Sequence, residues 1–289
     1  MAESTRAIRR RIRGIKNIQQ ITKAMQMVAA VRYTRMRSAA ENARPYVTKL
    51  QELMANLRQS ITSIEHPLFA RREVRKIWCV LITGDRGLCG TYNMNIIGEV
   101  NRFVEAQAST QIDWFVIGKK GHDALKRKGY PIKAFIPIGS GELSPSDMRN
   151  LVNDLIRGYE AREVDEVHLL FTHFVTVLTH RPTQVKILPL EGARDREEDK
   201  VQANFIFEPS AQEIITSLAP LFIETQIFRA IIESFVSEQA ARMVSMRNAT
   251  DNADEIIRDL TLRYNKARQT SITKELIDIV SGAEALRAT

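Results

Sequence analysis

The residues with the clearest potential for ligand chemistry form the glycine-rich loop 84–90, which reads GDRGLCG and follows an apolar run. A turn after the first strand of a parallel sheet is where doubly wound proteins bind dinucleotides or phosphates. The spacing here is GxxGxxG rather than GxGxxG, the Lys-Ser/Thr pair of a P-loop is absent, and Asp85 would repel phosphate. We therefore favour a tight turn that presents side chains to a protein partner, with nucleotide binding as the alternative.

The histidines and cysteines offer no second candidate site. The five histidines form no HExxH pattern and no cluster with carboxylates at ligand spacing, and we recognise no Ser-His-Asp order or nucleophile elbow. Cys79 and Cys89 give neither a disulfide framework nor metal-ligand spacing. We expect a chain without catalytic residues, without a metal and without a cofactor.

The middle of the chain has the pattern of an α/β domain that would position this loop. Eleven of the 13 glycines lie between Gly84 and Gly192, and glycine disfavours helix interiors. Apolar runs typical of buried parallel strands alternate with helical segments. The expected strands are 74–83, 112–117, 164–172 and, at an edge, 183–190, and the expected helices are 92–107, 119–128 and 145–159. This alternation predicts a doubly wound, Rossmann-like sheet.

The N-terminal arm has the apolar periodicity of a very long helix. Its apolar residues recur at helical spacing, at Ile8, Ile12, Ile15, Ile18, Ile21, Met25 and Val28, and then at Met36, Ala40, Ala43, Val47, Leu50, Met54, Leu57, Ile61 and Ile64. The second set steps alternately by four and three residues, which is a heptad seam. A helix of about 55 residues would be about 80 Å long, far more than a compact domain needs. Pro45 should kink it or disturb its hydrogen bonding.

The C-terminal arm has a similar seam, at Ala253, Ile257, Leu260, Tyr264 and Ala267. Pro209 suits a first helical turn, and Pro220 predicts an irregularity. Two long seams at opposite ends of the chain predict an antiparallel coiled coil, with two ordinary core helices as the alternative. The polar stretch 248–252 is either a solvated helix face or a surface for something other than the paired helix. The expected domains are the N-terminal helix 1–65, the Rossmann-like α/β domain 74–206 and the C-terminal helix 209–287.

Composition and charge limit the kind of partner. With 44% hydrophobic and 26% charged residues, the chain resembles an ordinary soluble protein. We expect no signal peptide and no transmembrane segment, because no apolar run approaches the roughly 20 residues that a span needs. The net charge is +8, and residues 1–58 contain 13 basic residues but only three acidic ones. Such a basic arm favours nucleic acid, anionic lipid or an acidic protein surface.

Three segments carry a resemblance to a known family. They are IRGIKNIQQITKAMQMVAAV at 12–31, GDRGLCGTYN at 84–93 and ARMVSMRNATDNADEIIRDLTLRYNKARQTSITKELIDIVSGAEAL at 241–286. In sequence and order they resemble the signatures of γ subunits of F-type ATP synthases. The departures are small: Gly84 stands for the usual Ser, Thr91 for a common Gly, and Val-Arg-Tyr at 31–33 for Ser-Lys-Met.

The resemblance implies a function as a rotor shaft. In this family the antiparallel coiled coil sits inside a ring of three α and three β subunits, and the Rossmann-like foot docks with the ε subunit on the membrane c-ring. Nucleotide chemistry occurs on the β subunits, so the chain itself would be non-catalytic and present in one copy per complex. It would bind no nucleic acid and lie peripherally on the cytoplasmic face of a bacterial plasma membrane.

The same resemblance assigns contact residues. Arg268 and Gln269 would hydrogen-bond a loop of β, with Thr273 one turn further on, although Arg268 could instead pair with an acid on its own helix. Lys23 and Met25 match a position facing the lever of β, where Met25 could equally pack in the seam. Arg86 and Cys89 match a loop near β, and Phe207 and Glu208 match the region that meets the c-ring.

Two rival functions remain at this point. A basic coiled-coil protein that binds nucleic acid would explain the charged arm but not the α/β segment, and a Rossmann-type enzyme would explain only that segment. Chloroplast γ subunits resemble this chain but carry an inserted redox-active cysteine pair. No such pair occurs here, so we expect no disulfide switching. We also expect the isolated chain to be helical but prone to aggregation.

Overall fold

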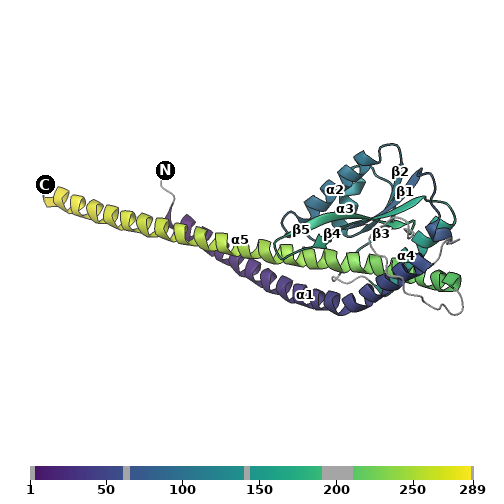
Figure 1. Ribbon diagram of the computed structural model, residues 1–289. Coiled ribbons are helices and arrows are strands. Elements are labelled where there is room, and N and C mark those ends of the chain that lie inside the picture. The colour runs from purple at the N-terminus through teal and green to yellow at the C-terminus, as the bar shows by residue number, and fades with distance from the viewer. Residues whose placement is uncertain (1–3, 61–65, 140–143, 191–210, 288–289) are drawn as a thin grey trace. The chain divides into compact units, whose positions relative to one another are not determined.

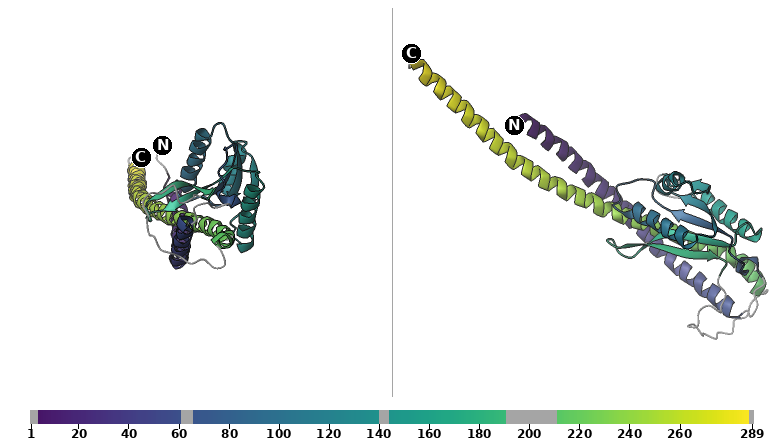
Figure 2. Two further views of the ribbon diagram at one scale, coloured as in Figure 1. Left: turned by 45° about the vertical axis from the view of Figure 1, so that its right-hand side comes forward. Right: turned by 90° about the horizontal axis from the view of Figure 1, so that it is seen from above.

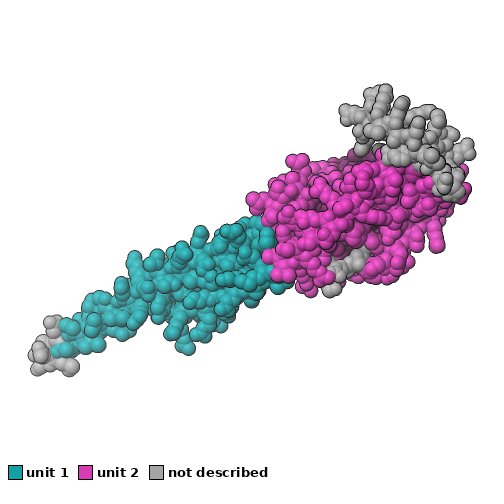
Figure 3. All heavy atoms as spheres, turned by 60° about the horizontal axis from the view of Figure 1, so that its bottom comes forward, with its two compact units in different colours: residues 1–29, 243–289 teal, residues 30–242 magenta. Residues whose placement is uncertain are grey.

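The computed structural model describes residues 4–60, 66–139, 144–190 and 211–287. Its elements are two terminal helices, α1 (Thr5–Ser60) and α5 (Ala211–Arg287), with an α/β segment between them (Figure 1). The chain divides into two compact units (Figure 3). Unit 1 contains residues 1–29 and 243–289, and unit 2 contains residues 30–242. Each unit is described by itself below.

Unit 2 contains a five-stranded sheet of strand order β3-β2-β1-β4-β5. The strands are β1 (Lys76–Ile82), β2 (Gln111–Ile117), β3 (Ile132–Ile136), β4 (Glu166–Phe174) and β5 (His180–Leu188). The first four are parallel, and β5 runs antiparallel to β4. The intervening helices are α2 (Tyr92–Ala106), α3 (Lys119–Arg127) and α4 (Pro145–Glu160), and a short 3-10 helix, η1 (Pro67–Phe69), precedes β1. The predicted doubly wound sheet with an edge strand at its end is confirmed.

Strand β3 is the element that the sequence pattern missed. It has only five residues, and its side chains alternate between half-buried and exposed positions. The other parallel strands, by contrast, are buried along almost their whole length. An edge strand lacks the continuous apolar run by which buried parallel strands are recognised.

The sheet of unit 2 is covered on both faces. Successive residues of β1 point to opposite faces, as in any strand. Trp78 and Val80 belong to a core shared with α4, α1 and the segment of α5 from Ile215 to Phe235. Ile77 and Cys79 belong to a second core shared with α2. Figures 1 and 2 show this part of α5 running along the sheet, in the position of a covering helix.

Helices α1 and α5 contain 56 and 77 residues, and each continues through its internal proline, Pro45 or Pro220. Each proline removes one donor from the helical ladder without ending the helix. The expected start of the second helix at Pro209 lies outside the described residues.

The two helices pair antiparallel within each unit, as predicted. In unit 2, Tyr33 packs with Val236 and Ala240, whereas Leu57 shares a core with Ile215. In unit 1, the hydroxyl oxygens of Thr22 and Thr250 lie 2.8 Å apart, and the Gln19 amide donates to the Asp254 carboxylate. Residues later in α1 therefore meet residues earlier in α5.

The predicted seam was wrong in the first part of α1. Ile18, Ile21 and Val28 were expected at the helix interface, but they are 55%, 58% and 55% exposed. The inward positions instead continue the alternating steps of four and three residues, through Ile8, Ile12, Ile15, Gln19, Thr22, Gln26, Ala29 and Tyr33. The spacing of a heptad fixes which side of a helix faces its partner, even where that side becomes polar.

The same contact corrects the reading of the polar stretch 248–252. Asn248, Asp251 and Asn252 are exposed, but Thr250 is 9% exposed and meets Thr22 of the paired helix. The stretch is therefore partly an interhelical contact. The seam predicted further along α5 is confirmed, because Ala253 and Leu260 are buried and Ile257, Tyr264 and Ala267 are half-buried.

Helix α5 is also apolar enough to resemble a membrane span. A stretch of 18 residues within Glu213–Ala283 has a mean hydropathy of 1.3, which by length and composition alone would suit a transmembrane helix. Ile215, Ile223 and Ile227 are fully buried in the core of unit 2. A buried core helix meets the same criterion, so this stretch is weak evidence for a span.

Two helical glycines give a matched test of packing in unit 2. A Cβ atom at Gly158 of α4 would lie 2.0 Å from the Trp78 ring, whereas one at Gly98 of α2 would meet nothing within 4 Å. We expect Gly158→Ala to lower the free energy of unfolding by about 1–3 kcal/mol through overpacking. Gly98→Ala should raise it by up to about 1 kcal/mol. Urea unfolding followed by circular dichroism checks both, and equal effects would contradict the packing.

His168 makes stability depend on pH. The residue is 5% exposed, and burial lowers the pKa of its side chain below 6.5, an effect that Glu166 partly opposes. The unfolded chain therefore binds this proton more readily, so the free energy of unfolding should fall as the pH drops below about 6.5. His168→Gln should flatten this fall between about pH 6.5 and 5. Unfolding curves at several pH values measure it, and the same slope in both proteins would exclude His168 as a contributor.

Candidate functional site

Loop 84–90 lies at the carboxyl end of β1, beside the point where the strand order reverses. The chain passes from β1 to β2 and β3 on one side, and then returns to β4 on the other side of β1. In open α/β sheets, ligands bind in the crevice at such a switch point. The loop therefore lies where such folds bind nucleotides, although its glycines do not have the spacing of a nucleotide-binding motif.

Helix α5 fills this crevice within unit 2. The Ser234 hydroxyl accepts a hydrogen bond from the Thr172 backbone N–H at 3.1 Å, at the end of β4. The Glu238 carboxylate lies so close to the loop that a Cβ atom at Gly84 would come within 2.8 Å of it. Glycine at this position permits the close approach. The chain's own helix thus occupies the place of a nucleotide.

Asp85 fastens the loop to neighbouring segments through backbone amides. Its Oδ1 accepts from the Lys119 N–H at 2.7 Å, and its Oδ2 accepts from the Ile138 and Gly139 N–H groups at 3.0 and 2.9 Å. Lys119 is the first residue of α3, where a negative charge is favourable. Asp85 therefore stabilises the loop rather than facing a ligand.

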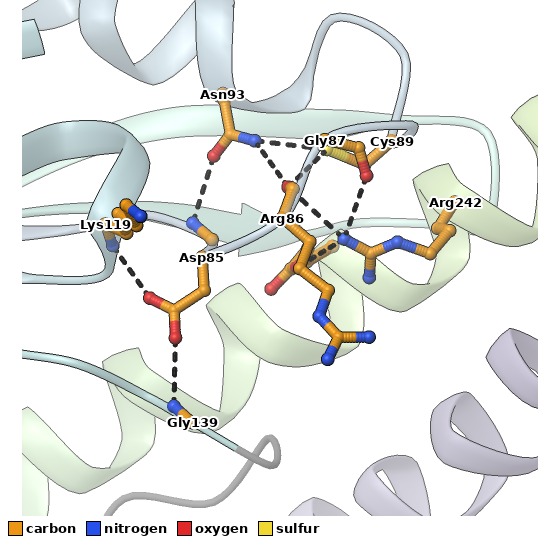
Figure 4. Close-up of polar contacts among 10 residues, drawn as sticks. Asp85, Arg86, Gly87, Cys89, Asn93, Lys119, Gly139 and Arg242 are labelled. Atoms are coloured by element: carbon orange, nitrogen blue, oxygen red, sulfur yellow. Dashed lines mark hydrogen bonds and ion pairs between the residues drawn. The ribbon is translucent and has the colours of Figure 1, made fainter. Parts of the chain in front are cut away.

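Asn93 and Arg242 hold the loop from two helices (Figure 4). The Asn93 amide accepts from the Gly84 N–H at 3.0 Å and donates to the Arg86 carbonyl at 3.3 Å and the Cys89 sulfur at 3.2 Å. The Arg242 guanidinium donates to the carbonyls of Arg86 and Gly87 at 3.5 and 3.4 Å. The carbonyl of Arg86 thus lies between a side chain of α2 and a side chain of α5.

Arg242 is itself fixed by a buried ion pair. It donates to Glu238 Oε1 at 2.5 Å, and the two residues are 8% and 6% exposed. Burial raises the pKa of Glu238, and the charge and hydrogen bond of Arg242 oppose that rise. Removing one partner of a buried pair leaves an uncompensated charge, which typically costs about 3–5 kcal/mol.

Some side chains of loop 84–90 are exposed to solvent, and others are buried against unit 2. Arg86 is exposed, and Leu88 is 62% exposed with a left-handed backbone (φ 61) that is uncommon for leucine. Cys89 is 1% exposed, and burial raises the pKa of its thiol. Of the two contact residues predicted in this loop, Arg86 faces outward and Cys89 faces inward.

The other predicted contact residues lie in unit 1 or outside the described residues. Lys23 is exposed on α1, and Met25 is half-buried there. Arg268, Gln269 and Thr273 are exposed on α5, and the Thr273 hydroxyl donates to the Gln269 carbonyl at 2.9 Å. Within the described part of the chain, no carboxylate forms an ion pair with Arg268. Phe207 and Glu208 lie outside the described residues.

Leu88, Glu238 and Arg242 were not among the residues predicted from the sequence. An opposite-charge pair four residues apart in an apolar part of α5 was the available signal for Glu238 and Arg242, because such charges are rarely buried unless paired. Among the residues that the structure describes, no group of three or more His, Cys, Asp or Glu side chains is placed to hold a metal ion.

The fold and the loop together define an α/β domain built on an antiparallel pair of long helices, with its nucleotide crevice closed by its own chain. A family model described as ATP synthase matches residues 4–286. The ATP synthase gamma chain of Desulfitobacterium hafniense is 43% identical over 284 residues, covering 98% of this chain and 99% of that protein. The corresponding chain of Heliobacterium modesticaldum is 42% identical over 288 residues, covering 97% and 98%. The chain belongs to the γ-subunit family of F-type ATP synthases.

Solved structures show the same fold at lower identity. A chain from the mitochondrial ATP synthase of Euglena gracilis aligns with a TM-score of 0.66 and 18% identity, covering 98% of this chain and 95% of that one. A chain from the central stalk and c-ring of the Tetrahymena thermophila mitochondrial enzyme gives a TM-score of 0.58 and 23% identity, covering 79% and 99%.

Asp85 gives a test of how the loop is held. An asparagine there keeps one acceptor oxygen and cannot serve all three amides, so Asp85→Asn should lower the free energy of unfolding by about 1.5–3 kcal/mol. Asp154→Asn, on an exposed position of α4, should change it by less than about 0.5 kcal/mol. Urea unfolding of both variants measures the difference, and a neutral Asp85→Asn would show that the amide bonds contribute little.

Proposed function

We propose that this chain is the central rotor shaft of an F-type ATP synthase, which couples c-ring rotation to conformational change at the β subunits and has no active site of its own. The observation that carries the proposal is the exposed apolar surface of its long helices. Every residue of α5 from 268 to 283 is exposed in this chain. Apolar residues in this region of α5 include Ile272, Leu276, Ile277, Ile279 and Val280, with 46–68% exposure.

Helix α1 has the same property in unit 1. Ile18, Ile21, Met27 and Val28 are 55–58% exposed, while the helix pairs with α5 through its other side. Contiguous exposed apolar surface of this kind marks a site of protein interaction. A segment without packing of its own also depends on a partner for stability, because isolated helices are marginal in water. A ring of subunits around both helices would supply that partner.

The proposed coupling mechanism depends on the asymmetry of the helix pair inside a nearly symmetric ring. A ring of near three-fold symmetry would meet a different side of the helix pair at each β subunit. A partner shifts a conformational equilibrium only by the difference between its contact energies with the two states. Each tenfold change in nucleotide affinity therefore requires about 1.4 kcal/mol of differential contact. Rotation would move those contacts around the ring and so couple turning to synthesis or hydrolysis.

Individual contacts are proposed from the motif positions. Arg268, Gln269 and Thr273 would bind a loop of β, and their exposure on α5 leaves them available. Arginine suits this role because it can bind a carboxylate with two parallel hydrogen bonds. Lys23, Met25 and the basic N-terminal arm would meet the acidic lever of β.

Further partners are proposed from the family. The solved relatives are described as parts of a central stalk with a c-ring, or of an assembly with F1 and a c-ring. We propose the same association for this chain, with an ε subunit, in one copy per complex, on the cytoplasmic face of a bacterial plasma membrane. Phe207 and Glu208 would then lie near the c-ring.

The deciding experiment measures ATP hydrolysis by a preparation of the α and β ring, with and without this chain, and by the chain alone. We expect no hydrolysis by the chain alone, stable incorporation of one copy per ring, and altered turnover of the ring. Hydrolysis by the chain alone, or no association with the ring, would exclude the shaft function.

Arg268 provides a test at one residue. We expect Arg268→Ala to lower ATP synthesis by the assembled complex about tenfold, equivalent to about 1.4 kcal/mol of lost contact, and Arg268→Lys to have an intermediate effect. The thermal stability of the chain should not change, because the residue is exposed.

Arg263→Ala is the matched control for Arg268. This exposed arginine lies five residues earlier on α5, about 140° around the helix, in a surface ion pair with Asp259. Its loss should leave synthesis near the wild-type rate, since surface pairs contribute little. Equal losses in both variants would show that position 268 has no specific role.

A further inference from the structure

Loop 84–90 is exposed at its tip, yet its backbone is held from several sides of unit 2. Side chains of α2 and α5 bind its carbonyl groups, and Asp85 within the loop binds the start of α3 and the amides of Ile138 and Gly139. A turn that only connected β1 to α2 would not require these contacts. The arrangement has the character of a preformed contact element, whose ordering cost is met before a partner binds.

The outward side chains of the loop are those that a partner could touch. Figure 4 shows the Arg86 guanidinium pointing away from Asn93, which binds the carbonyl of the same residue. Among the described residues, none accepts a hydrogen bond from this guanidinium. Leu88 stands outside in a left-handed conformation, and such strain persists only where the surroundings enforce it. A cation and an apolar group, two residues apart, match an acidic segment with an apolar side chain beside its carboxylates.

Arg242 is the group that enforces this conformation from α5. It binds the carbonyls of Arg86 and Gly87, the residues directly before Leu88. One guanidinium nitrogen, Nη2, makes these two contacts and the contact with the Glu238 carboxylate, so its position decides whether the loop and α5 stay joined. Glu238, one turn earlier on the same helix, keeps the guanidinium turned towards the loop.

We propose that Arg242 is a positioning residue, which clamps loop 84–90 to α5 so that Arg86 and Leu88 contact an acidic segment of the surrounding ring. The proposal rests on the shaft function described above. The clamp is defined here as the hydrogen bonds from Arg242 to the carbonyls of Arg86 and Gly87. Leu88 and Arg86 would contact the partner, whereas Cys89 is buried on the inner side of the loop that the clamp holds. Loosening the clamp would weaken coupling without releasing the chain from the ring.

The two cysteines of the chain report on the clamp separately. Cys89 lies in the loop, bonded by Asn93, and Cys79 lies in the middle of β1 with 0% exposure. Modification of the full-length chain by a maleimide, followed by peptide mass spectrometry, gives a rate for each thiol. Release of the loop should expose Cys89 alone, whereas general unfolding exposes both.

Two variants weaken the clamp without leaving a buried charge unpaired. Arg242→Lys keeps a positive charge beside Glu238 but removes Nη2, the atom that binds both carbonyls. The double variant Arg242→Gln with Glu238→Gln removes both charges together. In both we expect Cys89 to react at least tenfold faster, while Cys79 keeps its wild-type rate. Unchanged protection of Cys89 in both variants would overturn the clamp.

The functional measurement uses the chain assembled with the α and β ring. The clamp variants should bind the ring as the wild type does, but should lose about threefold to tenfold in ATP synthesis. Leu88→Asn should lose a similar amount while Cys89 stays protected, because asparagine tolerates the left-handed conformation. Leu178→Asn, at a 78% exposed position of the β4–β5 turn, is the control and should change neither measurement.

The outcomes separate this proposal from the shaft function. If the wild-type chain does not bind the ring, the shaft function fails, and the partner contact proposed here fails with it, while the rate of Cys89 still decides whether the clamp exists. Faster labelling of Cys89 with unchanged synthesis would overturn the positioning role of Arg242. Normal synthesis by Leu88→Asn would overturn the assignment of Leu88 as a contact.

Discussion

The alternating spacing of inward positions along α1 is the constraint on which the rest of this structure depends. Steps of four and three residues continue from Ile8 to Leu57, and the positions that they select face inward whether they are apolar or polar. Because one side of the helix is used in this way, other apolar residues are left on the outside. The same spacing thus produces both the paired helices and the exposed apolar surface of α1.

In unit 2, the packing of α5 has a second consequence. Its residues between Ile215 and Phe235 complete the core on one face of the sheet, and the next turns fill the crevice at the switch point. A fold commonly used to bind nucleotides is thereby converted into a support for a loop. Arg242 belongs to this same packing, so the loop's conformation is tied to the helix that would carry rotation.

Much of this could be predicted from the sequence, and the failures have physical causes. The long helices, four of the five strands and the turn after β1 follow from local periodicity and glycine placement. Ile18, Ile21 and Val28 were wrongly predicted to face α5 because they are apolar. The heptad spacing, and not the hydrophobicity of each residue, determines which side of α1 faces the other helix. Arg242 was missed because its carbonyl partners lie 155 and 156 residues away, and no local pattern reports such a contact.

The polar pairs between the helices of unit 1 also determine how the helices can be aligned. A slip of one heptad would displace one helix by about 10 Å along the other. Thr250 would then lie opposite Ile15 or Ala29, the residues one heptad from Thr22, and its hydroxyl would lose the partner it now has. An all-aliphatic seam would tolerate such a slip more easily. These polar contacts therefore specify the register of two otherwise repetitive helices. They are made by Thr22 with Thr250 and by Gln19 with Asp254.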